Sequence, residues 1–488
     1  MKSKGNKQHS LALNAILNTT KTVLGMLLSI FTFPYVSRVL NVDSLGAYNF
    51  SYSLVSYGLL IAGLGVASYS IREGSQYRDD KAKMEQFVSE VFSINMISTI
   101  VSYIYLFVCA FLIPSFGQYR VMILILSIEI FCTTIGVTWI GNIYEDFLYI
   151  TIRTIGFQII YLLLVFLCVR NQDDIYKYII ITTVTTSGSN ILNYFYLRNK
   201  YVKFHFTFHC NWKRHIKPIL IIFSYKIAIS IYVNSDKTIL GILTDDYSVG
   251  LYSAAVKIYS IIKEILVAMV TVLIPRFAIM LNNNTRKETD AFFSGIFNTF
   301  TLLLLPATIG LFLMSPEIIY TIAGESYYAA GQSLRILSIA VLFSMYANIY
   351  TTCILVPGKQ EGKVFWATVI SAVVNVVLNF ILIPYWGINA AALTTVIAEI
   401  IVFSLALFWA KEMISLVDVK MNIISILIAC IIIGIVCTLC KLFINNIYLR
   451  VSCAIVGSAF GYFTVLLMLK NAIVVNVTNK LLVRIRRR

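Results

Sequence analysis

The chain is poor in charged residues, which make up only 13% of its 488 residues, whereas 59% are hydrophobic. Soluble globular proteins are about half apolar and a quarter charged, so this composition argues against a soluble enzyme. Histidine is also scarce, with four residues, and no Ser/His/Asp constellation of a catalytic site appears. We therefore expect a membrane protein that is not an enzyme.

The nine cysteines are scattered, and most lie inside apolar runs, so a disulfide framework is not indicated. Cys437 and Cys440 form a Cys-x-x-Cys pair within the run IIIGIVCTLC. A reactive thiolate needs polar surroundings, so we interpret these two cysteines as small helix residues in lipid.

One loop gathers residue types that bind zinc, namely His205, His209, Cys210 and His215. These residues lack a paired ligand motif. The segment YVKFHFTFHC alternates aromatic and polar residues, which is typical of a segment at the membrane interface. We expect no metal site.

Long apolar runs dominate the rest of the chain. A helix that crosses the bilayer needs about 20 mostly apolar residues. The candidate runs cover residues 11–33, 47–70, 87–113, 120–143, 150–169, 175–197, 218–242, 250–275, 291–314, 333–356, 364–385, 388–410, 422–444 and 451–470. The sequence predicts an all-α polytopic membrane protein with about 14 transmembrane helices.

The basic residues alternate in step with these runs. If the N-terminus is cytoplasmic, 27 of the 39 Lys and Arg residues fall on the cytoplasmic side and seven on the other. Cytoplasmic loops are enriched in Lys and Arg, so both termini are predicted to be cytoplasmic. The net charge of +16 is then an orientation signal that also meets anionic lipid at the tail KLLVRIRRR, and nucleic acid is not an expected partner.

A short internal repeat indicates two halves. LNVDSLGAYNFS (40–51) and LTDDYSVGLYSA (243–254) share Leu, Asp and Gly-x-Tyr, and each opens the second span of a six-span set. Such residues are also common wherever helices begin. Parallel repeats of this kind place a substrate site between the halves near the midplane. We predict pseudo-symmetric six-helix bundles at 1–200 and 217–414, two further helices within 421–475, and a basic cytoplasmic tail at 476–488.

Several predicted spans carry charged residues, each of which costs about 2.5–3.5 kcal/mol at the bilayer centre unless it faces water or a partner. Three spans show polar stripes with helical spacing: Asn14, Asn18, Lys21, Gly25, Ser29 and Thr32; Lys226, Ser230, Asn234 and Lys237; and Ser253, Lys257, Ser260 and Glu264. Lys21 and Lys257 lie near the midplane of opposite halves, with no acid on their own stripe at the same depth. The pattern indicates a cavity built for an anion such as phosphate, unless one lysine snorkels or pairs with an acid.

The other charged residues have more than one interpretation. Lys226 and Glu264 are expected to form an ion pair, Asp236 and Lys237 to lie near the outer mouth, and Lys263 to reach the inner interface. Glu129 and Glu399 lie near the midplane, where they bind H⁺ or Na⁺ for coupling or are protonated structural acids. No other cofactor is expected.

The segments TFPYVSRVLNVDSLGAYNFS (32–51) and NSDKTILGILTDDYSVGLYSAAVK (234–257) resemble bacterial polysaccharide-transporter flippases of the O-antigen type. The resemblance implies translocation of undecaprenyl-pyrophosphate-linked oligosaccharide repeat units across the bacterial cytoplasmic membrane by alternating access. It implies a V-shaped central cavity with a cationic lumen and a C-terminal helix pair that holds a lipid tail. It also implies a polysaccharide polymerase and chain-length regulators as partners. The residues that correspond to the cationic lumen are Lys21, Lys226, Lys237 and Lys257, with Arg38 at the outer rim.

Three alternatives remain open. A multidrug or cation exchanger and a lipid II flippase have the same fold, and the exchanger is less favoured because the polar stripes carry more lysine than acid. A membrane polysaccharide polymerase or ligase is less favoured still, because the outer loops are short and contain no histidine.

Overall fold

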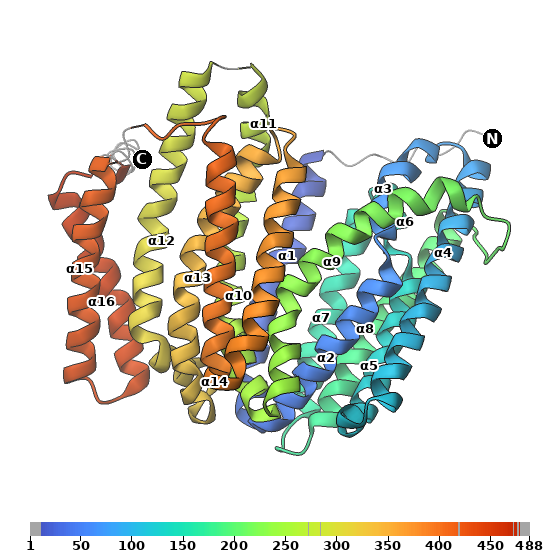
Figure 1. The fold of residues 1–488 in the computed structure, drawn as a ribbon, viewed down its shortest axis with the longest axis horizontal. Coiled ribbons are helices and arrows are strands. Elements are labelled where there is room, and N and C mark those ends of the chain that lie inside the picture. Colours follow the sequence, from blue (N-terminus) through green and yellow to red (C-terminus); the bar gives the residue numbers. More distant parts are fainter. Residues whose placement is uncertain are drawn as a thin grey trace. The chain divides into compact units, whose positions relative to one another are not determined.

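The computed structural model describes residues 11–271, 273–283, 285–417, 420–471, 473–475 and 478. In these ranges the chain is helical and contains no strand (Figure 1). It forms two compact units, Met1–Gly241 (unit 1) and Ile242–Arg488 (unit 2). The predicted all-α fold is confirmed, whereas the predicted tail lies outside the described residues apart from residue 478.

Unit 1 is built mainly from long helices that are joined by short turns. Its helices are α1 (Leu11–Val39), α2 (Val42–Gly63), α3 (Val66–Gly74), α4 (Lys81–Phe107), α5 (Arg120–Gly136), α6 (Thr138–Ile143), α7 (Phe147–Cys168), α8 (Ile175–Lys200) and α9 (Trp212–Leu243). Short helical turns lie at η1 (Ser75–Tyr77), η2 (Val108–Leu112) and η3 (Pro114–Tyr119). The predicted boundary between residues 200 and 217 stays a prediction. Helix α9 packs against α2 of unit 1, where Gly241 lies against the Phe50 ring.

Unit 2 has fewer but longer helices. They are α10 (Asp246–Thr271), α11 (Ile274–Asn283), α12 (Arg286–Ala323), α13 (Gly331–Ile349), α14 (Glu361–Ala410), α15 (Lys420–Phe443) and α16 (Ile447–Met468), with turns η4 (Glu325–Ala330) and η5 (Tyr350–Leu355). Helices α15 and α16 pack on each other and on α12, which confirms the predicted C-terminal pair.

Helix α14 is a helical hairpin, as the two predicted runs 364–385 and 388–410 require. The chain turns at Gly387, where φ is +52°, a backbone conformation that glycine adopts without steric cost. The two arms then pack together, because Ser371 Oγ donates to the Ala398 carbonyl at 2.8 Å and Thr394 Oγ1 donates to Asn379 Oδ1 at 2.6 Å.

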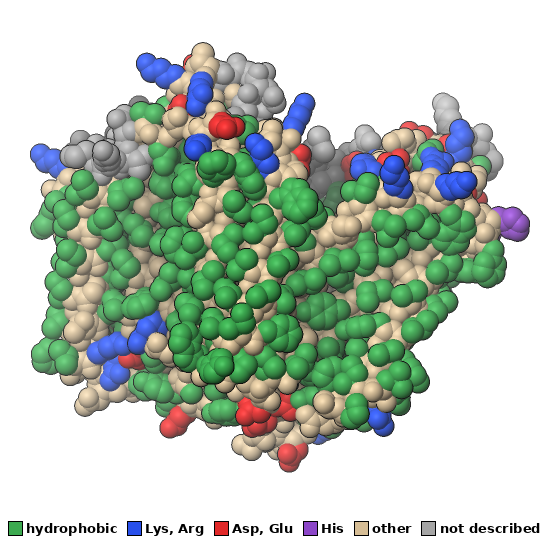
Figure 2. Space-filling model, viewed as in Figure 1, with side chains coloured by type: hydrophobic (Ala, Val, Ile, Leu, Met, Phe, Trp, Pro, Cys, Tyr) green, Lys and Arg blue, Asp and Glu red, His purple; other side chains and the backbone are tan. Residues whose placement is uncertain are grey.

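Many described helices suit a bilayer. Eleven of them are long and apolar enough to cross a membrane. Helices α8 and α10 have 26 residues each and are long enough but are more polar. Figure 2 shows helices covered with hydrophobic side chains, while charged side chains gather at the helix ends. The protein is therefore a multi-pass membrane protein, and the count of 14 spans stays a prediction.

The tyrosine of the repeated Gly-x-Tyr motif makes a comparable interhelical contact in each unit. In unit 1 the ring of Tyr48 on α2 meets that of Tyr178 on α8, with centroids 5.2 Å apart. In unit 2 the corresponding Tyr252 on α10 lies 3.3 Å from Thr395 Oγ1 on the second arm of α14. Tyr48 and Tyr252 therefore each contact the last helix of the predicted six-span set to which they belong, α8 and the second arm of α14.

The segments that follow α8 and α14 are held in a similar way in the two units, by backbone hydrogen bonds to side chains of another helix. After α8, the backbone N–H groups of His205 and Thr207 donate to Ser89 and Ser93 on α4. After α14, the N–H groups of Ser415 and Val417 donate to Asp290 and Ser294 on α12, both at 2.8 Å. Backbone groups outside helices need such partners when they are buried, and each unit supplies them from one helix, α4 in unit 1 and α12 in unit 2.

Candidate functional site

Lys21 lies on α1 where that helix packs along α7. Thr151 Oγ1 on α7 donates to the Leu17 carbonyl at 3.3 Å. One turn beyond Lys21, a Cβ at Gly25 would lie 3.0 Å from Gln158 Nε2, so glycine lets the two helices approach closely here. Lys21 is half-buried and forms no ion pair within the described residues. The side chains of Asn14 and Asn18, from the same predicted stripe, are not described.

Arg153 is the charged neighbour of Lys21. It lies inside α7 and is only 8% exposed, and its positive charge acts on the Lys21 ammonium. Its Nη1 donates to the Ser189 carbonyl on α8 at 3.3 Å. Its Nε is buried and has no hydrogen-bond partner in the described part of the chain. Arg153 falls near the start of the predicted run 150–169, and in the structure it lies in the second turn of α7.

These two cations form the most distinctive polar feature of unit 1. Like charges at one place are unfavourable unless water or an anion lies between them. A buried N–H without an acceptor also costs free energy, and the Arg153 Nε is such a donor. Phosphate oxygens would satisfy both groups, because arginine and lysine are the usual phosphate binders. We call Lys21 and Arg153 the α1–α7 cation pair.

Lys257 lies on α10 of unit 2 and is half-buried. The acid whose charge acts on it is Glu264, two helical turns away and exposed to the surface. Within the described residues Lys257 forms no ion pair. Because Lys21 and Lys257 belong to different units, the shared cavity stays a prediction, and so does the ion pair of Lys226 with Glu264.

Lys226, Lys237 and Arg38 all belong to unit 1. Lys226 and Lys237 are half-buried on α9, whereas Arg38 is exposed in the last turn of α1. Asp236 beside Lys237 is 6% exposed, deeper than a residue at an open mouth would be. The roles of these three cations in binding stay predictions.

Glu399 is already paired inside unit 2. Its Oε1 lies 2.8 Å from Lys263 Nζ and accepts from Tyr259 Oη at 3.0 Å. Lys263 therefore binds this buried carboxylate, and its place at the inner interface stays a prediction. The pairing favours the structural interpretation of Glu399 over an ion-coupling role.

Glu129 on α5 has different surroundings. It is half-buried, and its charge acts on Tyr48 and Tyr52 of α2. Tyr48 also meets Tyr178, whose hydroxyl accepts from Tyr161 Oη at 3.3 Å. Glu129 forms no ion pair among the described residues, so the structure leaves it as an acid within a tyrosine cluster.

Of the zinc-type residues predicted to share one loop, His215 lies in α9 and packs inside unit 1, whereas His205 and His209 are exposed. His215 is fully buried, its Nδ1 lies 2.6 Å from Tyr69 Oη, and its Nε2 lies 2.7 Å from Glu90 Oε2. In the described ranges no three His, Cys, Asp or Glu side chains are grouped as they would be around a metal ion.

Comparison with known protein families shows to which family this chain belongs. The profile of the family described as "polysaccharide biosynthesis protein" matches residues 11–281, more than half of the chain. The chain belongs to this family. The match includes α1 and α7, so the α1–α7 cation pair lies within the family's region.

Two curated relatives of this chain have names that describe transport. A Haloferax volcanii protein named as the low-salt glycan biosynthesis flippase Agl15 is 30% identical over 33% of this chain and 34% of its own length. An Escherichia coli K12 protein named as an O-antigen transporter is 22% identical over 75% of this chain and 89% of its own.

Solved structures share the fold of this family member. The lipid II flippase MurJ in an inward closed conformation matches with a TM-score of 0.71 at 19% identity, covering 95% of this chain and 100% of that one. An inward-facing multidrug resistance MATE transporter matches with a TM-score of 0.58 at 12% identity, covering 80% and 94%. The chain therefore shares the fold of these solved structures.

Proposed function

We propose that the protein is a flippase that moves a lipid-linked oligosaccharide across the bacterial cytoplasmic membrane, for assembly of O-antigen or another surface polysaccharide. The α1–α7 cation pair carries this proposal, because two cations on membrane-type helices, neither in an ion pair among the residues that the structure describes, suit a pyrophosphate. Family membership and the transport names of the two relatives support it. The lipid carrier is taken to be undecaprenyl pyrophosphate.

The proposed mechanism is alternating access. The pyrophosphate enters from the cytoplasmic leaflet and binds Lys21 and Arg153 of unit 1 together with Lys257 of unit 2. The sugars occupy a wet cavity, and the polyprenyl chain stays in lipid. The two halves then rock about the bound pyrophosphate, so that the site opens to the other leaflet. The chain itself performs no covalent chemistry in this cycle. A polymerase and its chain-length regulators then use the repeat unit outside.

Deletion of the gene tests the proposal. Surface glycan is expected to disappear, and the polyprenyl-pyrophosphate-linked repeat unit to accumulate in the cell, where mass spectrometry of the lipid extract identifies its sugars. Drug extrusion with no change in glycan would instead support the exchanger alternative. Arrest of cell-wall growth, with accumulation of lipid II, would support the lipid II alternative.

Arg153 is expected to contribute to binding of the pyrophosphate. Replacing it with glutamine keeps a polar side chain but removes one of the two charges. Affinity for undecaprenyl pyrophosphate should fall about 10- to 150-fold, because a charge-assisted contact is worth about 1.5–3 kcal/mol. Binding to the purified protein measures this. Arg198→Gln, an exposed arginine at the end of α8, is the control. Equal affinity of Arg153→Gln and the unchanged protein would remove Arg153 from the site.

Glu129 is our candidate for proton coupling, since it is an acid among tyrosines that forms no ion pair in the part of the chain that the structure describes, whereas Glu399 is held by Lys263. Glu129→Gln mimics the protonated acid, so transport should lose its dependence on a pH gradient while the protein remains folded. Uptake into vesicles with and without an imposed gradient measures this. A variant that responds to the gradient as strongly as the unchanged protein would rule out coupling through Glu129.

A further inference from the structure

A second group of cations lies in unit 2, where α12, α15 and α16 meet. Glu317 of α12 is 5% exposed; its Oε1 lies 3.0 Å from Lys441 Nζ, near the end of α15, and 3.7 Å from Arg450 Nη1, near the start of α16. Figure 2 shows basic side chains beside an acidic one at the lower ends of these helices, on an otherwise hydrophobic face.

Positive charge exceeds negative charge at this place. Arg335 of α13 joins Lys441 in lining a cavity of about 240 Å³, with Phe312, Leu313, Cys437 and Thr438 as its other walls. Arg335 Nε donates to the Phe312 carbonyl and Nη1 to Gln332, both at 3.2 Å, and within the described residues it forms no ion pair. Glu317 neutralises one charge, so two of the three cations remain. We call this the cationic pocket.

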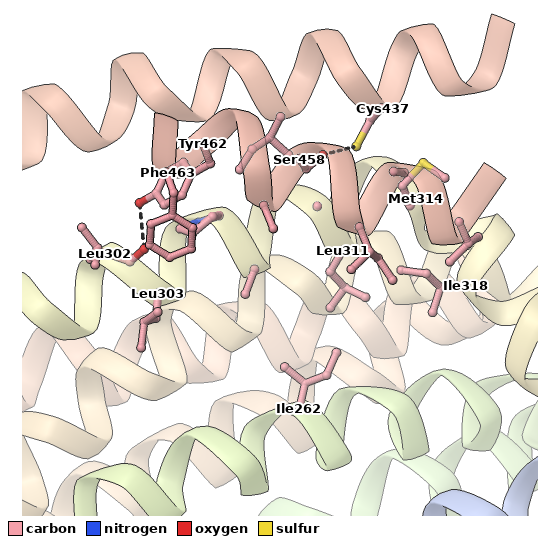
Figure 3. A pocket seen from close by; sticks show the side chains of 18 residues that line it. Ile262, Leu302, Leu303, Leu311, Met314, Ile318, Cys437, Ser458, Tyr462 and Phe463 are labelled. Atoms are coloured by element: carbon pink, nitrogen blue, oxygen red, sulfur yellow. Dashed lines mark hydrogen bonds between the residues drawn. The ribbon is translucent and has the colours of Figure 1, made fainter. Parts of the chain in front are cut away.

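An apolar slot continues from the cationic pocket. The slot has a volume of about 330 Å³ and lies between α12, α15 and α16 (Figure 3). Cys437 lines both spaces. The polar groups in its wall are engaged, since Tyr462 Oη donates to the Leu302 carbonyl at 2.7 Å and Cys437 Sγ lies 3.7 Å from Ser458 Oγ. The slot therefore offers hydrocarbon contacts only.

Helical spacing aligns the two spaces. On α15, Ile433 lines the slot, Cys437 lines both spaces, and Lys441 lines the cationic pocket, so one helix face runs from apolar to charged at intervals of four residues. On α16, the slot residues Ala454 and Ser458 follow Arg450 at the same interval. Between Val451 and Phe463 the slot extends about 18 Å along α16, slightly more than half of the ~30 Å hydrocarbon core.

We propose that this surface binds a membrane phospholipid with an anionic headgroup. The phosphate lies in the cationic pocket against Arg335 and Lys441, and one acyl chain lies in the slot. The slot is about as long as one leaflet is deep, so it fits the acyl chain of a phospholipid better than a polyprenyl chain, which is longer. The site goes beyond the proposed function, because the occupant is a resident lipid of the bilayer rather than the transported molecule. On the predicted orientation the site faces the outer leaflet.

The test measures lipid retention by the purified full-length protein with native mass spectrometry. Phosphatidylglycerol and phosphatidylethanolamine with identical chains are compared at equal concentrations. Phosphatidylglycerol should be retained about five-fold more, as expected for a basic residue near an anionic headgroup. Arg335→Gln should remove this preference, whereas Lys363→Gln, which makes the same charge change outside the pocket, should keep it. Gly310→Leu should reduce retention of both lipids, because Gly310 lines the slot and a Cβ there meets open space.

Two results would overturn the proposal. One is equal retention of the two phospholipids by the unchanged protein, a comparison that needs no variant to fold. The other is retention of undecaprenyl pyrophosphate with no retention of phosphatidylglycerol, which would make the slot part of the transport path. Retention of phosphatidylglycerol by a protein that no longer transports would support this site while the proposed function fails.

Discussion

Cells that carry Lys21→Ala or Lys257→Ala are expected to lose surface glycan while the amount of protein in the membrane stays normal. Both lysines are half-buried and lack an ion pair in the described residues, so their removal leaves no buried acid without its partner. What is lost is the charge available to a pyrophosphate, and with it the transition between leaflets. Immunoblots of surface glycan and of the protein, from cells that express each variant in place of the natural chain, measure both effects.

Arginine and a distant lysine supply the controls for this experiment. Lys21→Arg and Lys257→Arg keep the charge and should restore much of the glycan, since arginine also binds phosphate. Lys177→Ala removes a lysine whose partner is Asp174 near the start of α8 and should leave glycan unchanged. Normal glycan in both Lys21→Ala and Lys257→Ala cells would contradict the anion site.

Glu399→Ala should have the largest effect on stability. The change leaves Lys263 without its carboxylate partner and Tyr259 without its acceptor inside unit 2. Loss of one partner from a buried ion pair costs about 3–5 kcal/mol, and because Lys263 remains 30% exposed we expect a value near the lower end. The apparent melting temperature of the purified protein in detergent, followed by scanning fluorimetry, should fall clearly.

A double variant separates a structural pair from a coupling site. Glu399→Leu together with Lys263→Leu removes both charges, so its melting temperature should exceed that of Glu399→Ala. Transport by the double variant should still respond to a pH gradient if Glu399 is structural. Loss of the gradient response in a stable double variant would return Glu399 to the coupling role.

The fold was largely predictable because a bilayer restricts what a chain can do. Apolar runs long enough to span must form helices, and the runs on either side of Gly387 are the two arms of α14. The repeated Gly-x-Tyr motif marked equivalent positions, since Tyr48 and Tyr252 each contact the last helix of their own set. The lengths of the apolar runs and the repeated Gly-x-Tyr motif were therefore enough to predict the helical architecture.

The site was less predictable because partners come from distant segments. Arg153 lies near the start of the predicted run 150–169, where a basic residue resembles an orientation signal. Its burial depends on α8, which supplies the Ser189 carbonyl. Lys263 and Glu399 lie 136 residues apart, and no local spacing reveals such a pair. The sequence offered one local indication that Arg153 packs within a helix, namely a tyrosine four residues before it. The Arg153 guanidinium lies 5.8 Å from the Tyr149 ring centroid.

Reconstitution tests the central claim most directly. Purified protein is placed in liposomes that contain undecaprenyl-pyrophosphate-linked oligosaccharide in both leaflets, and a glycosidase that cannot enter is added outside. Because a flippase connects the two leaflets, nearly all of the oligosaccharide should be cleaved, whereas liposomes with Lys21→Ala protein should stop at about half, the share of the outer leaflet. Cleavage that stops at the outer-leaflet share with the unchanged, folded protein would contradict the account.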